Sequence, residues 1–432
     1  MQQTPVVVIV DAYSTARHLA PLFRERGYDC VHVQSVAEIP ESMVASFRPE
    51  DFTATVVHAG DLAGTVEVLA GYAPVAVVAG MELGVRLADS ITQSMGLRTN
   101  GTALSAARRD KFTMVETARA AGIPVAGQVL ATDWDTLAAW YREVGGSVVL
   151  KPLSSAGNDG VFFCDDVEQV RAAFTALAGT RNALGLIDGV VAQEYLVGGE
   201  FYVNTVSLDG VHHVCDIWWT ERMNVNGVRD VQSSCHLLPR RGADQDLLVE
   251  YTFRVLDALG IVNGPAHTEL KLTPAGPRLI ETGARPCGGD LPVLTRKAIG
   301  EGQLEWTVDG AVDPERFMAR CHDDYEIDKH VICMHMISPS SGTLVGYPKL
   351  AEITAMDSFH EALLRVAPGE EIHRSVGDWT MPMLVHFVHE IQSNVRRDYG
   401  TARYLDGDGF YDITDITDGA GFTGAELQEA RA

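Results

Sequence analysis

Two glutamates, Glu269 and Glu281, lie on either side of the segment Pro274-Ala275-Gly276-Pro277. Residues before this segment alternate in character, which predicts a β-strand, and the proline- and glycine-rich segment predicts a turn into a second strand. Counting back through the turn places Glu281 nearly opposite Glu269. Because facing carboxylates in a strand pair lie about 5 Å apart, they repel each other. A divalent cation between them would convert this repulsion into binding, so the pair predicts a metal site.

Three further side chains belong to the same stretch. Alternation places His267 and Lys271 on the face that carries Glu269. His267 is able to orient a metal ligand, although a buried histidine with satisfied hydrogen bonds explains it equally well. Arg285 follows Glu281 by four residues and is able to hold an anion beside the metal. The stretch as a whole predicts a metal-bound phosphate site.

A second candidate site is Lys151, which ends an apolar run at 147–152 and precedes the segment Ser154-Ser155-Ala156-Gly157-Asn158-Asp159-Gly160. A lysine at a strand end can reach phosphate oxygens as a point charge. Small residues let backbone N–H groups approach an anion closely. The P-loop pattern Gly-x4-Gly-Lys-Ser/Thr is absent. An ordinary hairpin loop with an exposed lysine is the alternative interpretation.

A third candidate site is the stretch 190–201, which contains two acids six residues apart, Glu194 and Glu200. The pattern predicts a strand, a bend and a new strand. Such a bend can present backbone N–H and C=O groups to a purine edge, while Glu200 accepts hydrogen bonds from ribose hydroxyls. The alternative is a plain strand connection with solvated acids.

The composition limits the class of protein. With 34 basic and 58 acidic residues the formal net charge is −24, which argues against nucleic acid or an anionic membrane as a partner. We expect no ordinary signal peptide at the N-terminus, and no apolar stretch approaches the roughly 20 residues that a spanning helix needs. Seven scattered cysteines without CxxC spacing indicate reduced thiols and a cytoplasmic protein.

The length of 432 residues predicts two to four domains. Apolar runs at 6–10, 55–58 and 75–79, with helical patterns between them, predict an open parallel sheet. Helices are expected at 110–121, 134–143 and 167–178, with strands at 147–152 and 161–164. From residue 190 onward the pattern is rich in strands. The chain is therefore of mixed α/β and α+β class.

The order of the candidate residues along the chain resembles that in the ATP-grasp enzymes. These residues are Lys111, Lys151, the 154–160 segment, the 193–200 segment and the acid pair. The resemblance covers roughly residues 5–400 and implies an ATP-grasp fold preceded by a Rossmann-like parallel sheet. It divides the chain into an N-terminal α/β domain (1–105), a small lobe with the glycine-rich loop (106–190), a large lobe with the metal and substrate site (191–330) and a C-terminal segment that completes the large lobe (331–432).

The resemblance also implies roles for single residues. Arg285 and Lys151 are expected to be catalytic, Glu269 and Glu281 to hold one or two Mg²⁺ ions, with Mn²⁺ as an alternative, and Arg285 to lie beside the substrate as well. The expected ATP-binding residues are Lys111, Lys151, Ser154, Ser155, Gly157, Gly160, Gln193, Glu194, Tyr195, Leu196 and Glu200. The remaining expected substrate residues are Gly288, Gly289, His236 and Arg222, the last two in an insertion that roofs the substrate site.

The stretch 280–290 resembles the L-amino acid ligase branch, although Gly283 stands where many ATP-grasp members have a metal-binding Asn. The implied reaction joins two amino acids through an acyl phosphate and releases ADP and phosphate. Its partners are small-molecule substrates, and a homodimer is an expectation from the family alone. A ligase for another carboxylate or a nucleotide precursor, and a nucleotide-binding sensor without catalysis, remain alternatives.

Overall fold

The computed structural model describes residues 4–39, 41–153, 160–179, 181–182, 185–186, 189–407 and 409–417. The chain folds into two compact units. Unit 1 comprises Met1–Val125, Phe201–Ile217 and Pro239–Glu326, and unit 2 comprises Ala126–Glu200, Trp218–Leu238 and Ile327–Ala432. Each unit is therefore assembled from segments that are far apart in the sequence.

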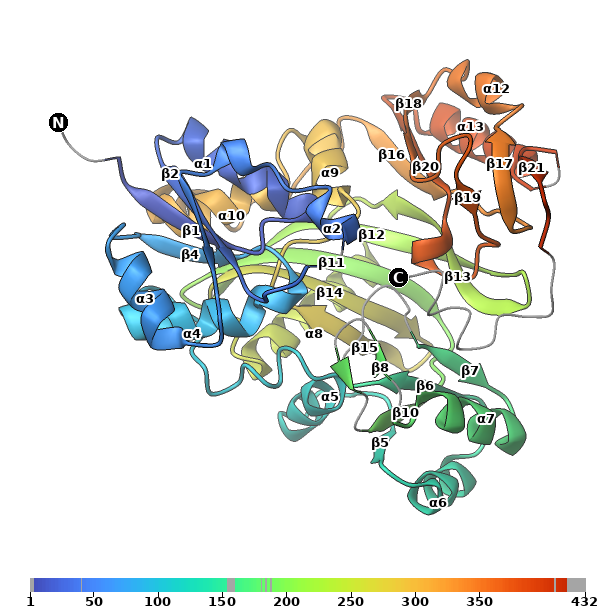
Figure 1. Cartoon of the computed structure of the whole chain (residues 1–432), viewed down its shortest axis with the longest axis horizontal. Helices are drawn as coiled ribbons and strands as arrows, with labels where there is room; N and C mark the ends of the chain where they lie inside the picture. The colour runs from blue at the N-terminus through green and yellow to red at the C-terminus, as the bar shows by residue number, and fades with distance from the viewer. Residues whose placement is uncertain are drawn as a thin grey trace. The chain divides into compact units, whose positions relative to one another are not determined.

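Unit 1 begins with the expected parallel sheet, in the order β3-β2-β1-β4 (Figure 1). Its strands are β1 (Val6–Val10), β2 (Asp29–Gln34), β3 (Ala54–Val57) and β4 (Ala76–Ala79). Val7 and Ile9 of β1 pack with α1 (Leu19–Glu25), whereas Val8 and Val10 pack with α3 (Leu62–Ala70) and α4 (Val85–Met95). Because both faces of β1 are covered, its sequence is an unbroken apolar run.

The sheet has a topological switch point between β1 and β4. The chain continues from β1 to β2 and β3 on one side, and β4 pairs with the other side of β1. Asp11 directly follows β1 and accepts hydrogen bonds from the Ser35 backbone N–H (2.8 Å) and hydroxyl (2.6 Å). The 3-10 helix η3 (Glu82–Gly84) follows β4. In open α/β sheets, ligands bind at the carboxyl ends of the strands beside the switch point. Glu82 therefore lies in a position suited to a binding site.

The rest of unit 1 contains antiparallel strands and helices. Strand order is β15-β14-β11-β12, of which β12 continues into unit 2. The strands are β11 (Gly199–Leu208), β12 (Val211–Val225), β14 (Gly264–Thr273) and β15 (Gly276–Gly283). The helices are α5 (Lys111–Ala120), α8 (Ala243–Ala258), α9 (Leu291–Ile299), α10 (Gln303–Val312) and α11 (Pro314–Arg320), and shorter turns are η1 (Ser14–His18), α2 (Glu41–Val44) and η2 (Pro49–Asp51).

Unit 2 contains a small antiparallel sheet in the order β5-β10-β6-β7. Its strands are β5 (Gln128–Ala131), β6 (Val148–Pro152), β7 (Phe162–Cys164) and β10 (Val190–Glu194). Helices α6 (Trp134–Val144) and α7 (Val167–Leu177) bury Leu137 and Val170 against this sheet. The helices and strands predicted between 134 and 178 are thus confirmed. A two-stranded pair, β8 (Arg181–Asn182) and β9 (Gly185–Leu186), lies between α7 and β10 in the sequence.

The second part of unit 2 continues from β12 through β13, β16, β20 and β18. Its core contains Met334, Val385 and Phe387. The strands are β13 (Val228–Leu237), β16 (His330–His335), β18 (Phe359–Leu364) and β20 (Met383–His389), with a second sheet of β17 (Gly342–Gly346), β19 (Glu371–Ile372) and β21 (Asp412–Thr414). The helices are α12 (Leu350–Thr354), α13 (Gln392–Leu405) and η4 (Asp378–Thr380).

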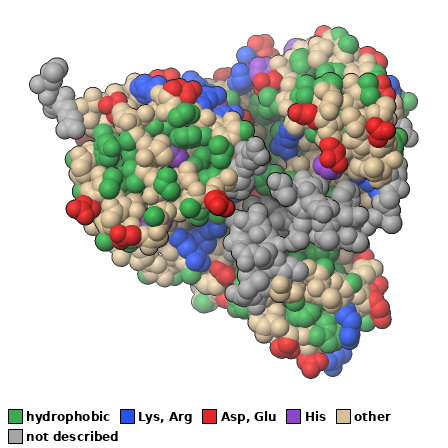
Figure 2. Space-filling model, in the orientation of Figure 1, with side chains coloured by type: hydrophobic (Ala, Val, Ile, Leu, Met, Phe, Trp, Pro, Cys, Tyr) green, Lys and Arg blue, Asp and Glu red, His purple; other side chains and the backbone are tan. Residues whose placement is uncertain are grey.

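The surface agrees with the charge balance of the sequence. On the face drawn in Figure 2, the described Lys and Arg side chains form small separate groups with Asp and Glu side chains nearby. Among the described residues, no helix is both long and apolar enough to cross a membrane. All seven cysteines are buried free thiols, as expected.

Candidate functional site

The hairpin predicted from the sequence is present in unit 1. Strands β14 and β15 pair antiparallel, and Glu269 is the direct partner of Glu281. On the opposite face, the hydroxyls of Thr268 and Thr282 are 2.8 Å apart and share a hydrogen bond. The register shifts just after Glu269. The two carboxylates therefore share one face of the hairpin, which confirms the predicted geometry of the acid pair.

Each carboxylate of this pair has a cationic side chain beside it. Lys111, the first residue of α5, forms an ion pair with Glu281 through its Nζ atom. Asp110 caps α5 by accepting a hydrogen bond from the Thr113 backbone N–H at 2.6 Å, which fixes the start of the helix and hence the position of Lys111. On β14, His267 Nε2 lies 3.1 Å from Glu269 Oε1. These cations offset the repulsion between the two acids.

His267 is held by a chain of buried hydrogen bonds. Asn204 donates from Nδ2 to Asp216 Oδ1 at 2.5 Å, so its Oδ1 atom faces His267 Nδ1 at 2.7 Å as an acceptor. His267 consequently donates from both ring nitrogens, to Asn204 and to Glu269, and is an imidazolium. Burial alone lowers the pKa of His267, but its interactions with Cys287 and Glu269 raise the pKa to about 10. His267 therefore lies in a position from which it can orient the Glu269 carboxylate.

Glu82 joins this group from the N-terminal sheet. It accepts a hydrogen bond from Arg109 Nη1 at 2.6 Å on Oε1, and another from Arg285 Nε at 3.2 Å on Oε2. Burial raises the pKa of Glu82, but Arg285 and Arg109 outweigh burial and hold the pKa below its usual value. The sequence analysis assigned Glu82 no role. Its one local signal is an acid placed directly after the last parallel strand.

Glu82 explains why residue 283 is glycine. A Cβ atom on Gly283 would lie 2.7 Å from Glu82 Oε2 and 3.3 Å from Arg285 Nε. The first distance is too short for any side chain unless Glu82 moves. The space in which an Asn side chain would begin is therefore filled by the Glu82 carboxylate.

Hydrogen bonds and an ion pair fix both ends of the loop that follows β15, residues 284–290. Gln303 accepts a hydrogen bond from the Cys287 backbone N–H at 2.7 Å and donates to the carbonyls of Thr205 (3.1 Å) and Ala266 (2.9 Å). Asp290, the last residue of the loop, binds Arg17 through both carboxylate oxygens, at 3.1 and 2.5 Å. Between these anchors, the predicted substrate residues Gly288 and Gly289 are exposed. A bound molecule can thus approach the backbone of a fixed loop.

Unit 2 carries the predicted phosphate and adenine residues. Lys151 lies on β6, where it is buried and paired in register with Val191. Gly160 has a φ of +69° and packs near Pro152 and Leu177, a backbone conformation that favours glycine. Ser154, Ser155 and Gly157 lie outside the described residues. Lys151 is therefore not the exposed hairpin lysine of the alternative interpretation.

The predicted hinge follows the expected pattern of strand, bend and strand. Gln193 and Glu194 end β10, and β11 begins at Gly199 after Tyr195 and Leu196. Gln193 Nε2 donates to Gln128 Oε1 at 2.8 Å, and the Tyr195 hydroxyl donates to Asp230 Oδ2 at 2.8 Å. The bend between the two strands is therefore held by side chains as well as by pairing.

Glu200 and Arg222, predicted for ribose and substrate, form a buried ion pair with each other. Arg222 also donates from Nη1 to the Asp230 carbonyl at 3.3 Å. The structure thus joins these two residues within unit 2, a contact that the sequence did not indicate.

Two comparisons identify the family. The profile of the ATP-grasp domain matches residues 144–292. Dapdiamide A synthase of Enterobacter agglomerans is 34% identical over 372 residues, which cover 84% of this chain and 87% of that protein. This chain belongs to the ATP-grasp ligases. It is an ATP-dependent carboxylate–amine ligase, as the order of its motifs predicted.

More distant relatives agree with this assignment of the ATP-grasp ligase. Alanine–anticapsin ligase of Bacillus subtilis (strain 168) is 23% identical over 277 residues, 57% of this chain and 58% of that protein. The crystal structure of L-amino acid ligase from Bacillus licheniformis superposes with a TM-score of 0.74 at 16% identity, and covers 96% of this chain and 100% of that chain. The predicted ATP-grasp fold with an N-terminal parallel sheet is therefore confirmed.

The donor set of this ATP-grasp ligase suits Mg²⁺. Within the described ranges, no three His, Cys, Asp or Glu side chains are grouped so as to hold a metal ion by themselves. Glu269 and Glu281 supply two facing carboxylates, and Mg²⁺ typically takes one or two carboxylates together with phosphate and water oxygens. The residues present therefore fit a Mg²⁺ ion that is completed by a nucleotide.

His236, one of the expected substrate residues, lies in unit 2 of the ligase. It lies on β13, and Arg222 lies on the paired strand β12. His236 Nε2 is 2.8 Å from Ser234 Oγ, and its ring centroid is 4.8 Å from that of Trp219 and 5.2 Å from that of Tyr399. Burial lowers the pKa of His236 to about 4.

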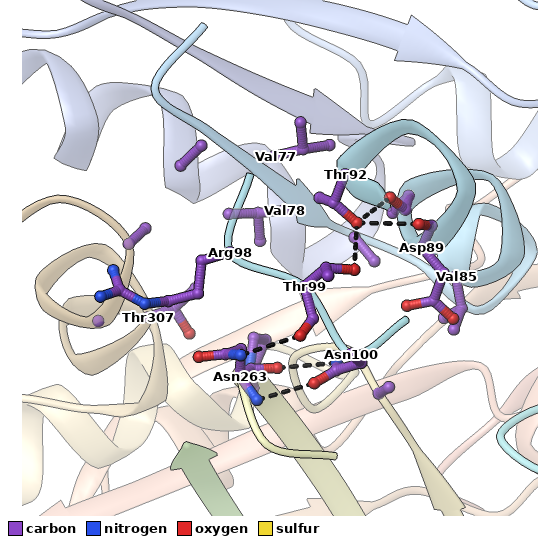
Figure 3. A pocket seen from close by; sticks show the side chains of 18 of the residues that line it. Val77, Val78, Val85, Asp89, Thr92, Arg98, Thr99, Asn100, Asn263 and Thr307 are labelled. Carbon is purple, nitrogen blue, oxygen red and sulfur yellow. Dashed lines mark hydrogen bonds between the residues drawn. The ribbon is translucent and has the colours of Figure 1, made fainter. Parts of the chain in front are cut away.

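A pocket in unit 1 of the ligase lies beside β4, α4 and the start of β14 (Figure 3). Its cavity volume is about 90 Å³. Thr92 and Thr99 share a hydrogen bond of 2.7 Å, Asn100 donates to the Asn263 carbonyl at 2.9 Å, and Asn263 donates to the Thr99 carbonyl at 3.0 Å. These four residues of the pocket lining therefore already hydrogen-bond with one another.

Proposed function

We propose that this ATP-grasp ligase joins the carboxylate of one amino acid to the amine of a second and releases ADP and phosphate. The observation that carries the proposal is the facing pair Glu269 and Glu281, with Lys111 and Arg285 around it. Two of the relatives named above are an alanine–anticapsin ligase and an L-amino acid ligase by their names, and the third is a dapdiamide A synthase. ATP and small-molecule substrates follow from the family, and the peptide product is the finer part of the proposal.

The chemistry proceeds in two steps. A carboxylate is a poor electrophile, so its oxygen first attacks the γ-phosphorus of ATP. The bond from that phosphorus to the β–γ bridging oxygen breaks, and ADP leaves. The amine nitrogen of the second substrate then attacks the acyl carbon, the bond to the phosphate oxygen breaks, and the nitrogen loses a proton. The products are an amide and inorganic phosphate, and no enzyme nucleophile is needed.

We assign roles in ATP binding and phosphoryl transfer to the following residues. Lys111 and Lys151 bind phosphate oxygens of ATP, and Arg285 offsets negative charge at the transferred phosphoryl group and the acceptor carboxylate. The assignments of Glu194, Tyr195 and Leu196 to the adenine, and of Glu200 to the ribose, remain part of this proposal. When bound by Glu269 and Glu281, one or two Mg²⁺ ions supply further charge neutralisation.

The loop after β15 is assigned to the substrates. Gly288 and Gly289 present backbone groups beside Arg285, while Gln303 keeps the loop in place. The four-domain division at residues 105, 190 and 330 and a homodimer complete the proposal. We also place the reaction in the cytoplasm, in agreement with seven free thiols.

The test is ADP release from ATP and Mg²⁺ over a matrix of amino-acid pairs and single carboxylic acids. We expect specific pairs to stimulate ADP formation, with the dipeptide detected by mass spectrometry. Stimulation by a carboxylic acid that is not an amino acid would assign another ligase reaction. No stimulation by any acid would contradict catalysis and favour a nucleotide sensor.

A further inference from the structure

Arg285 donates a hydrogen bond from Nε to Glu82 Oε2 at 3.2 Å, and the carboxylates of Glu281 and Glu269 also act electrostatically on its guanidinium group. The latter two oppose each other on the hairpin, where each also has its own cation, Lys111 or His267. The third, Glu82, arrives from the end of β4 and is bound by Arg109. The acids around Arg285 therefore fall into a facing pair suited to a metal and one separate carboxylate.

The Glu82 carboxylate is complementary in charge to the ammonium group of an amino-acid substrate. If Arg285 holds the carboxylate that becomes phosphorylated, an α-amino acid brings an ammonium group only one carbon atom away from it. That ammonium requires an acceptor close to Arg285, because burying it without a hydrogen-bonding partner is costly. Glu269 and Glu281 face a cation site already. Glu82 is the remaining carboxylate that contacts Arg285 directly, at 3.2 Å from its Nε atom.

Glu82 is also able to accept another donor. Its side chain keeps 14% of its surface exposed, so a small molecule can reach it. A carboxylate has about four lone-pair positions, and Arg109 and Arg285 approach one oxygen each. The two arginines also lower the pKa of Glu82, which keeps the group ionised at neutral pH.

Because Gly283 has no side chain, the Glu82 carboxylate can lie beside it. A Cβ atom at 283 would lie 2.7 Å from Glu82 Oε2 and would force Glu82 to move. The backbone φ of Gly283 is not in the left-handed region, so backbone conformation does not require glycine there. The absence of a side chain at 283 is explained by the carboxylate that occupies the space.

We propose that Glu82 binds the α-ammonium group of the acyl-donor amino acid, and that Gly283 is glycine so that this carboxylate can lie beside Arg285. The inference rests on the proposed ligase reaction. It assigns the first substrate to the class of α-amino acids with a free amino group.

The test compares two donors in wild type and Glu82→Gln. One donor is the amino acid that gives the fastest ADP release in the matrix, and the other is the same acid without its amino group. Glycinamide serves as the acceptor because it has an amine and no carboxylate. We expect Glu82→Gln to lower kcat/KM for the amino acid roughly 10- to 100-fold, as for loss of a charged hydrogen bond, and to change that of the desamino acid only slightly.

Two matched variants separate binding from positioning. Arg109→Gln removes one ion pair of Glu82 but keeps its carboxylate, so it should lower kcat/KM for both donors alike. Gly283→Ala displaces the carboxylate without removing it and should reproduce the selective loss, which provides a second route if Glu82→Gln does not fold. An equal loss for both donors in Glu82→Gln and in Gly283→Ala would show that Glu82 only positions Arg285. If no carboxylate stimulates the wild-type enzyme, the ligase reaction itself fails, and with it this assignment.

Discussion

Replacement of Lys111 by methionine should destabilise the protein through the hairpin of unit 1. Lys111 is 7% exposed and pairs with Glu281, which faces Glu269 across the strands. Two charges about 5 Å apart repel by about 3 kcal/mol at an effective dielectric constant of about 20. The carboxylate side chains are 21% and 25% exposed, so solvent screens part of this energy. We expect a loss of about 1–3 kcal/mol, or a fall in Tm of roughly 5 °C.

The assay is thermal unfolding of wild type and Lys111→Met with and without Mg²⁺. Mg²⁺ should raise the Tm of the variant more than that of the wild type, because the cation replaces the missing charge between the two acids. Lys297→Met is the matched control, since Lys297 is an exposed lysine on α9 of the same unit. Equal Tm values for Lys111→Met and wild type, or an equal response to Mg²⁺, would refute the role of Lys111 in offsetting the repulsion.

Three further results are expected. Glu281→Gln should abolish ADP release while the far-UV circular dichroism stays unchanged, and normal turnover would remove Glu281 from the metal site. The pKa of His267 is about 10 in the folded state and about 6.5 in an unfolded chain, so its stabilisation is complete below about pH 6.5 and is lost as the pH rises towards 10. The free energy of unfolding of wild type should therefore fall more steeply than that of His267→Gln between these values, whereas parallel curves would contradict an imidazolium. Gln303→Leu leaves three backbone groups without their hydrogen-bonding partner and should lower the free energy of unfolding in urea by about 2 kcal/mol or more. An unchanged urea midpoint would show that water replaces the Gln303 side chain.

Sequence patterns predicted the helices and hairpins that depend on residues close together in the sequence. The pairing of Glu269 with Glu281 followed from alternation and a turn, because strand register in a short hairpin depends on residues close in sequence. The helix expected at 110–121 is present as α5 (Lys111–Ala120), with Asp110 as its cap. Strand β2 was missed, since its alternation includes His32, which is buried among aromatic rings instead of lying at the surface.

Contacts between distant segments could not be predicted in the same way. Lys111 and Glu281 are 170 residues apart, and Glu82 and Arg285 are 203 residues apart. No periodicity relates such positions, because their proximity depends on how β4, α5 and β15 pack together.

The sequence by itself determined the family, the acid pair and the ATP-dependent chemistry, because these depend on residue types in a definite order and on one local hairpin. Only the tertiary structure decided which cation neutralises each acid and why residue 283 is glycine. Gly283 looked like a missing metal ligand in the sequence. In the fold, Glu82 Oε2 lies 2.7 Å from where the Cβ atom of residue 283 would be, so a side chain there would force Glu82 to move.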